Sequence, residues 1–345
     1  MNVALFLGAG FSAPFGHPTM DGFLGFADAC LRLTDDDRSF LGRLVLDARR
    51  ANSFLESSPT NIEDILSFSE MGERLLLTGE KERRRDRLCK IIQQIYTSSP
   101  PAAEYWPRYK ALETLLGGEL DKVKTSLSFI TTNYDLNVES ACISNGLHVD
   151  PGFPLFKMEE GGVQVIDYYY STGSVPLYKL HGSVNWYASD NESEVMVDDR
   201  VVVVLSPFAE HAPHSLPYPC TKGYKAPGIP VIVPPSFLKP ELLKAALRAA
   251  WQGAAKVLST ANVVVFVGYS FPPSDTEMMY FLARALMDNT VVRAVYIVDP
   301  MADAIVARLR GAGSKMGSHF RNLLRPINCG WTEATLPLES LFVMP

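Results

Sequence analysis

Two polar side chains come directly after stretches that have the length of strands. Asn133 follows the stretch 127–132, and His181 follows the stretch 176–180. An amide carries both donors and an acceptor, so Asn133 is able to orient a hydroxyl group or a water molecule. An imidazole exchanges a proton near neutral pH, so His181 suits general acid–base chemistry. The structural alternatives are that Asn133 caps the helix predicted after it and that His181 is a buried structural histidine.

The beginning of the chain contains a glycine-rich turn of the kind that binds phosphate groups. Apolar residues 3–7 predict a short buried strand, and Gly8 and Gly10 then begin a Gly-x-Gly-x-x-Ala pattern. Gly8 suits a tight turn, Gly10 lets a phosphate approach the backbone, and free N–H groups of the following helix would face a diphosphate. Ser12 is the expected N-cap of that helix. A plain turn is the alternative. The acidic residue of a dehydrogenase fingerprint is missing, since Asp28 falls in a helical pattern.

Two later strands also end in small or polar residues. The run 263–267 predicts a buried parallel strand that ends at Gly268 and Ser270, and the run 291–298 predicts a strand that ends at Asp299. Ligands of open α/β sheets bind outside the carboxyl ends of the strands, so these residues are candidates for one common site.

Two more polar residues each have two possible roles. Asp135 either contacts a ligand or caps the helix predicted over 136–144. His17 follows the glycine turn closely, so it is either an ordinary loop histidine or a ligand contact.

The order of these elements predicts an α/β fold, a Rossmann-like parallel sheet with a helical insertion or cap. Strands and helices alternate after residue 240, which implies right-handed crossovers and parallel pairing. Residues 20–120 show helical periodicity and a capping box at 60–63, with no strand pattern. We therefore expect them to form an insertion over the nucleotide site.

A second insertion is expected over residues 146–240, which read as irregular chain with a β-hairpin. The expected strands within it are Tyr168–Tyr170, a hairpin over 195–205 that turns at 198–199, and a short edge strand over 229–235. We expect residues 1–345 to form a single domain that carries both insertions.

Composition excludes several classes of protein. The chain has 345 residues, of which 47% are hydrophobic, and a formal net charge of -6, so nothing global indicates nucleic-acid binding. No apolar run reaches membrane-spanning length, and the five cysteines are scattered without a Cys-x-x-Cys pair. We expect a cytoplasmic protein that does not use the membrane.

Taken together and in this order, four strand ends resemble the sirtuin-like superfamily. They are most similar to bacterial sirtuin-like domains of antiphage defence systems, many of which hydrolyse NAD. The segments that carry the resemblance are 8–12, 131–135, 179–183 and 268–270. The resemblance covers nearly the whole chain, about residues 3–300, and the set of motifs is more specific than any one of them.

The resemblance implies a role for each motif. The first motif would cradle the NAD diphosphate, the second and third would flank the nicotinamide ribose, and the late motif would contact the phosphates and the adenosine ribose. Carried over, the catalytic candidates are Asn133 and His181, and the NAD-binding candidates are Gly8, Ala9, Gly10, Ser12, Asp135, Gly268, Ser270 and Asp299.

Two departures from the family pattern bear on the reaction. Protein deacylases of the superfamily carry a four-cysteine zinc module between the histidine motif and the late glycine–serine motif, and here that interval contains only Cys220. They also carry a Pro-Asp-Phe-Arg segment after the first loop, where residues 17–20 here read His-Pro-Thr-Met. Both favour hydrolysis of NAD, as substrate and without a metal, to nicotinamide and ADP-ribose. An NAD-dependent deacylase and a non-enzymatic module that senses NAD or ADP-ribose are the alternatives.

An unrestrained NAD hydrolase would harm its own cell, so the activity should be controlled. The helical insertion is the candidate for a cap or an oligomer contact. The resemblance implies a homo-oligomer, or a partner ATPase or nucleic-acid-guided defence protein.

Overall fold

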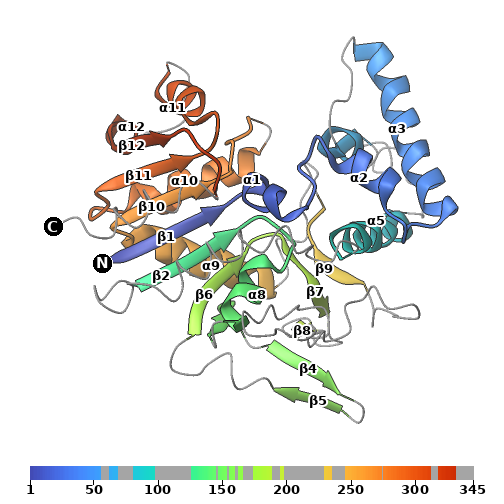
Figure 1. Cartoon of the computed structure of the whole chain (residues 1–345), viewed down its shortest axis with the longest axis horizontal. Coiled ribbons are helices and arrows are strands. Elements are labelled where there is room, and N and C mark those ends of the chain that lie inside the picture. The colour runs from blue at the N-terminus through green and yellow to red at the C-terminus, as the bar shows by residue number, and fades with distance from the viewer. Residues whose placement is uncertain are drawn as a thin grey trace, which may run out of the picture.

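The computed structural model describes residues 1–55, 62–68, 81–97, 126–144, 147–153, 155–159, 162–165, 174–188, 195–197, 229–234, 245–273, 275–311 and 318–331. At its centre is a seven-stranded sheet in the order β12-β11-β10-β1-β2-β6-β3, in which every pairing is parallel (Figure 1). Its strands are β1 (Asn2–Leu7), β2 (Ser126–Thr131), β3 (His148–Asp150), β6 (Ser174–Lys179), β10 (Val263–Val267), β11 (Ala294–Val298) and β12 (Leu324–Ile327). The predicted Rossmann-like α/β fold is confirmed.

Helices cover both faces of this sheet. They are α8 (Asn137–Ser144), α9 (Ala245–Thr260), α10 (Thr276–Met287), α11 (Ala302–Arg310) and α12 (Ser318–Leu323). Side chains of β1 alternate between the faces: Ala4 and Phe6 pack in the core beneath α9, α10 and α11, whereas Val3, Leu5 and Leu7 pack in the core beneath α8. A strand that is buried on both faces is apolar throughout, which explains why residues 3–7 show no polar alternation.

The strand order reverses at β1. From β1 the chain builds outward to β2 and β6 on one side and to β10, β11 and β12 on the other. Leu7 is in register with Thr131 of β2 and with Val267 of β10, so the carboxyl ends of the three strands are level. This is the topological switch point, where open α/β sheets bind their ligands.

Helices of the first insertion gather beyond the carboxyl end of β1 (Figure 1). They are α2 (Phe23–Ala29), α3 (Asp35–Leu55), a helical segment over 62–68, and α5 (Lys81–Tyr96). Their apolar faces form a core of their own, which also includes Tyr134 from the loop after β2, Val184 of β7 and Ile232 of β9. The predicted helical character is therefore confirmed for the described part of 20–120. The first half of the capping box and residues 98–125 lie outside the described residues.

A second sheet lies below the first (Figure 1) and has the strand order β5-β4-β8-β7-β9. Its strands are β4 (Leu155–Glu159), β5 (Gly162–Val165), β7 (Gly182–Ala188), β8 (Val195–Val197) and β9 (Pro230–Ile232). Within the insertion expected over 146–240, the prediction of irregular chain is wrong where β3, β4 and β5 lie. Each of them has only three to five residues, too few to establish an alternating pattern. The predicted edge strand is confirmed by β9, while the predicted strand over 168–170 and the turn at 198–199 lie outside the described residues.

The other predicted elements match closely, with small differences at their ends. β12 is the exception, because Arg325 and Pro326 interrupt its apolar pattern at the edge of the sheet. In the parts of the chain that the structure describes, no helix has the length and apolar character needed to cross a membrane.

Candidate functional site

Four motif residues lie at the carboxyl ends of four adjacent strands. Gly268, Gly8, Asn133 and His181 follow β10, β1, β2 and β6, which are neighbours in that order. Thr131 is in register with Lys179, so Asn133 and His181 each stand two residues beyond a register pair. The loops are joined further by the hydrogen bonds from Leu180 N to Thr131 O (2.8 Å) and from Val184 N to Tyr134 O (3.2 Å). The fold therefore brings these motifs to one edge of the sheet.

The glycines of the first and last motifs lie against each other. A Cβ on Gly8 would lie 2.5 Å from Gly268 O, and a Cβ on Gly10 would lie 2.8 Å from Gly268 Cα. Gly268 itself has a φ of +60°, and a Cβ there would lie 2.2 Å from Phe11 N. These positions require glycine because two backbone segments touch, a reason that is separate from any phosphate.

The N–H groups of the glycine turn are largely used within the protein. Gly8 N donates to Val267 O (2.9 Å), Gly10 N donates to Gly268 O (2.9 Å), and Phe11 N donates to Gly8 O (3.0 Å). The expectation that the turn offers a row of free donors is wrong for these three groups. The helix is also short: α1 (Ala9–Ser12) has four residues and passes into the 3₁₀ helix η1 (Ala13–Phe15).

Ser12 is the N-cap residue of the 3₁₀ helix η1, but its side chain makes no capping hydrogen bond there. Gly8 is the N-cap residue of α1, and Ser12 is the last residue of that helix. Its buried hydroxyl donates to Asp135 Oδ2 (2.5 Å) and accepts from Asn133 Nδ2 (2.8 Å). Ser12 thus joins the first motif to the second.

Asn133 is buried, with 9% of its surface exposed, and its amide is oriented by the first motif. Nδ2 donates to Gly8 O (2.7 Å) as well as to the Ser12 hydroxyl. Gly8 O only accepts hydrogen bonds, so the amide nitrogen must face it and the amide orientation is determined. Since the amide is planar, these two bonds also set the direction of Oδ1.

Asp135 caps helix α8, which is one of the two roles predicted for it. Its Oδ1 accepts a hydrogen bond from Asn137 N (3.1 Å) at the start of α8, and its Oδ2 accepts from Ser12. A ribose contact for this carboxylate stays a prediction.

A buried ion pair behind these loops was missed by the sequence reading. Lys179 is 1% exposed, and its Nζ lies 2.7 Å from Glu139 Oε1. The same ammonium donates to the carbonyl oxygens of Tyr134 and Asp135. Burial raises the pKa of Glu139, and the Lys179 ammonium partly opposes that shift. A lysine inside an otherwise apolar strand was the available signal.

His181 lies at the end of β6 with 9% of its surface exposed. Its carbonyl accepts a hydrogen bond from Val233 N (2.8 Å), which joins it to the segment after β9. Gly182 follows with a φ of +82°, and a Cβ there would lie 1.9 Å from Val231 O. The glycine of the His-Gly pair is thus required by the close approach of β9.

The remaining candidates lie on the other side of β1. Ser270 is exposed, and its carbonyl accepts a hydrogen bond from Arg308 of α11. Asp299 ends β11, and its Oδ1 accepts from Met301 N (2.8 Å), so the carboxylate supports the turn into α11. Gly268 N donates to Val298 O (2.9 Å), which places the ends of β10 and β11 together.

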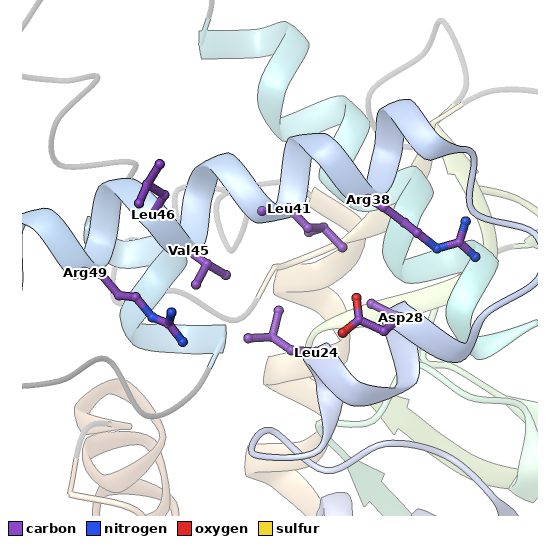
Figure 2. A pocket seen from close by; sticks show the side chains of 9 residues that line it. Leu24, Asp28, Arg38, Leu41, Val45, Leu46 and Arg49 are labelled. Carbon is purple, nitrogen blue, oxygen red and sulfur yellow. The ribbon is translucent and has the colours of Figure 1, made fainter.

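A pocket of about 590 Å³ lies between α2 and α3, within the helical insertion (Figure 2). Apolar side chains such as Leu24, Leu41 and Val45 line it, with Asp28 and Arg49 among the polar ones. None of its lining residues belongs to the strand-end loops. It is therefore separate from the candidate site.

Comparisons with known proteins place the chain in a family. No curated protein sequence matches it. Similar solved structures include a Sir2 homologue in complex with NAD, with 14% identity, a TM-score of 0.44, and coverage of 99% of this chain and 89% of that one. Another is Sir2Tm bound to a propionylated peptide, with 13% identity, a TM-score of 0.35, and coverage of 98% and 92%. The family model described as SIR2-like domain matches residues 127–317, more than half of the chain. The chain belongs to the SIR2-like domain family.

Proposed function

We propose that this protein is an NAD glycohydrolase, which cleaves the bond between nicotinamide and ribose to give nicotinamide and ADP-ribose. The observation that carries the proposal is the pair of hydrogen bonds from Asn133 Nδ2 to Gly8 O and Ser12 Oγ. They join the amide to the glycine turn at the switch point of the sheet, beside the strand that ends at His181. Membership of the SIR2-like domain family supports NAD as the substrate.

The proposed NAD site spans the carboxyl ends of β11, β10, β1, β2 and β6. The diphosphate lies over the first and late glycine motifs, whose binding residues are Gly8, Ala9, Gly10, Ser12, Gly268 and Ser270. Asp299 lies near the adenosine, and Asp135 near the nicotinamide ribose. Holding the dinucleotide along its length keeps the reacting bond in position.

In the proposed reaction the bond from the ribose anomeric carbon to the pyridinium nitrogen breaks, and its electron pair neutralises the nicotinamide. The ribose becomes oxocarbenium-like and is attacked by water. Asn133 Oδ1 orients this water or a ribose hydroxyl, and neutral His181 accepts the water's proton directly or through the ribose hydroxyls. These steps need no metal.

Hydrolysis is preferred to deacylation because of two sequence departures. The interval between His181 and Gly268 contains only Cys220, so the four-cysteine module of the deacylases is missing. The Pro-Asp-Phe-Arg segment is replaced by residues 17–20. A deacylase and an NAD-sensing module are therefore the alternatives to be tested.

Release of free nicotinamide, with and without an acylated peptide, separates these functions. A hydrolase releases it without peptide, a deacylase requires peptide, and a sensor binds NAD saturably without product. His181→Ala and Asn133→Ala should each lower the rate by about 10²–10⁴-fold while NAD binding, measured separately, persists. Undiminished nicotinamide release by both variants would refute the assigned roles.

We further propose that the enzyme acts in antiphage defence by depleting NAD, as a homo-oligomer or under a partner ATPase or nucleic-acid-guided protein. The helical insertion over 20–120 would supply the cap or the oligomer contact. Its core includes Tyr134 from the loop after β2 and Val184 of β7, close to Asn133 and His181 in the chain, which supports a coupling between the insertion and the site. Full activity of the purified monomer would contradict this control.

A further inference from the structure

A buried histidine lies between the glycine turn and the helical insertion. His17 is 8% exposed, and its backbone N–H donates to Ser12 O (3.4 Å). Its ring stacks on Tyr96 of α5, with 5.4 Å between the ring centroids and 20° between the ring planes. The Tyr96 hydroxyl donates to Pro18 O (3.3 Å), so Tyr96 contacts both His17 and the residue after it.

The imidazole faces the polar groups at the start of α8. It is hydrogen-bonded to the side chain of Asn137, and the nearest charges are the Asp135 carboxylate and the Lys179 ammonium. Glu139 neutralises that ammonium, and Tyr96 supplies the remaining ionisable group from α5. Burial lowers the pKa of His17, with Asp135 and Asn137 opposing that shift, so the ring is neutral at physiological pH.

The Asn137 side chain bonds to His17, and from the backbone N–H of the same residue a series of hydrogen bonds leads to the catalytic candidate. Asn137 N donates to Asp135 Oδ1 (3.1 Å), Ser12 donates to Asp135 Oδ2 (2.5 Å), and Asn133 donates to Ser12 (2.8 Å). A change at one end of such a buried network alters the geometry at the other end, since every member has a fixed partner.

We propose that His17 is a positioning residue for the reaction: through Asn137 and Asp135 it holds the Ser12 hydroxyl against the Asn133 amide, and Tyr96 of α5 holds His17 in place. This inference rests on the proposed function for its kinetic consequence, although its structural consequence does not. It also gives the helical insertion a direct contact with the network that orients Asn133. Since the His17 ring contacts Tyr96 and Asn137, and the hydrogen bonds from Asn137 lead to Asn133, its loss should affect turnover more than binding.

Substitutions of His17 in the full chain test this role. His17→Phe keeps an aromatic ring for Tyr96 but cannot hydrogen-bond to Asn137, so kcat should fall about tenfold while KM changes less than about threefold. His17→Asn and His17→Gln keep a neutral polar group at the Nδ1 and Nε2 positions respectively, and one of them should restore most of the turnover. The matched control is His319→Phe, since His319 is exposed on α12. Unchanged kcat in His17→Phe, or no recovery in either polar variant, would overturn the proposal.

Crystal structures give a readout that needs no activity. In the His17→Phe protein the separation of Asn133 Nδ2 and Ser12 Oγ should exceed 2.8 Å, the value in the unsubstituted chain, and the Asp135 carboxylate should rotate. An unchanged Ser12–Asp135–Asn133 arrangement rejects the positioning role even if the unsubstituted protein proves inactive. If the unsubstituted protein releases no nicotinamide, the proposed function is rejected. The positioning role of His17 is then decided by the structural comparison alone.

Discussion

The side-chain amide of Asn133 donates a hydrogen bond of 2.8 Å to the hydroxyl of Ser12, 121 residues earlier in the chain. This bond crosses from the loop after β2 to the helix after β1 at the switch point of the sheet. It makes the orientation of the proposed catalytic amide depend on the glycine turn. The two motifs therefore work as one unit.

Removing the Ser12 hydroxyl should weaken the orientation of Asn133. In Ser12→Ala the amide keeps only its bond to Gly8 O, and Asp135 loses a buried donor. We expect kcat for nicotinamide release to fall about 3- to 10-fold, the worth of one hydrogen bond. Steady-state kinetics measure this, with Ser259→Ala, whose side chain bonds only to Lys256 O in its own helix, as control. A kcat equal to that of the unsubstituted protein would contradict the account.

Glycine is required at position 268 by backbone contact. Gly268→Ala places a side chain at a φ of +60° and a Cβ 2.2 Å from Phe11 N, so the two loops must separate. We expect a loss of at least about 1–2 kcal/mol in the free energy of unfolding. Gly42→Ala, in the middle of α3 with nothing within 4 Å of the added Cβ, should instead raise it by about 1 kcal/mol. Urea titrations measure both, and equal stabilities of the two variants would refute the loop contact.

Replacing one partner of the buried ion pair should lower the free energy of unfolding more than replacing both partners. In Lys179→Met the Glu139 carboxylate stays buried without its partner, so the free energy of unfolding should fall by about 3–5 kcal/mol. The double variant Lys179→Met/Glu139→Leu leaves no uncompensated charge and should recover part of the loss. A double-mutant cycle in chemical denaturation measures the coupling. Additive losses would mean that the two residues do not stabilise each other.

The lowered pKa of His17 has a consequence for stability. The folded chain resists protonation of the buried ring, whereas the unfolded chain takes up the proton near pH 6.5. Stability should therefore fall as the pH drops below about 6.5, until the pH reaches the lowered folded-state pKa. His17→Gln does not titrate, so its stability relative to the unsubstituted protein should improve across that range. A difference that stays constant with pH would show that His17 is not the titrating group, and His319→Gln is the control.

Much of the central sheet could be predicted from the sequence. β1 and β10 are buried on both faces, so residues 3–7 and 263–267 appear as uninterrupted apolar runs, whereas serine and threonine residues interrupt the apolar pattern of β2. β4, β5 and β12 could not be found in the same way, because they are short strands at or next to the edge of a sheet, with too few residues to establish an apolar pattern.

The candidate site was only partly predictable for a similar reason. Local patterns located the strand ends, but they could not reveal that Gly8 and Gly10 touch Gly268, since residue types give no information on contacts between segments so far apart in the chain. Ser12 is a residue type that caps helices, yet its hydroxyl donates to the Asp135 carboxylate and accepts from the Asn133 amide in place of a local N–H group. Lys179 is the last residue of β6, and its ion pair with Glu139 could not be predicted because the two residues are distant in the sequence.

The most direct test of the central claim is a structure of the His181→Ala protein with NAD at saturating concentration. The expected result has the diphosphate over the turns at Gly10 and Gly268, with the nicotinamide ribose between Asn133 and position 181. NAD bound in the pocket between α2 and α3, or with its nicotinamide end over β11, would contradict the account.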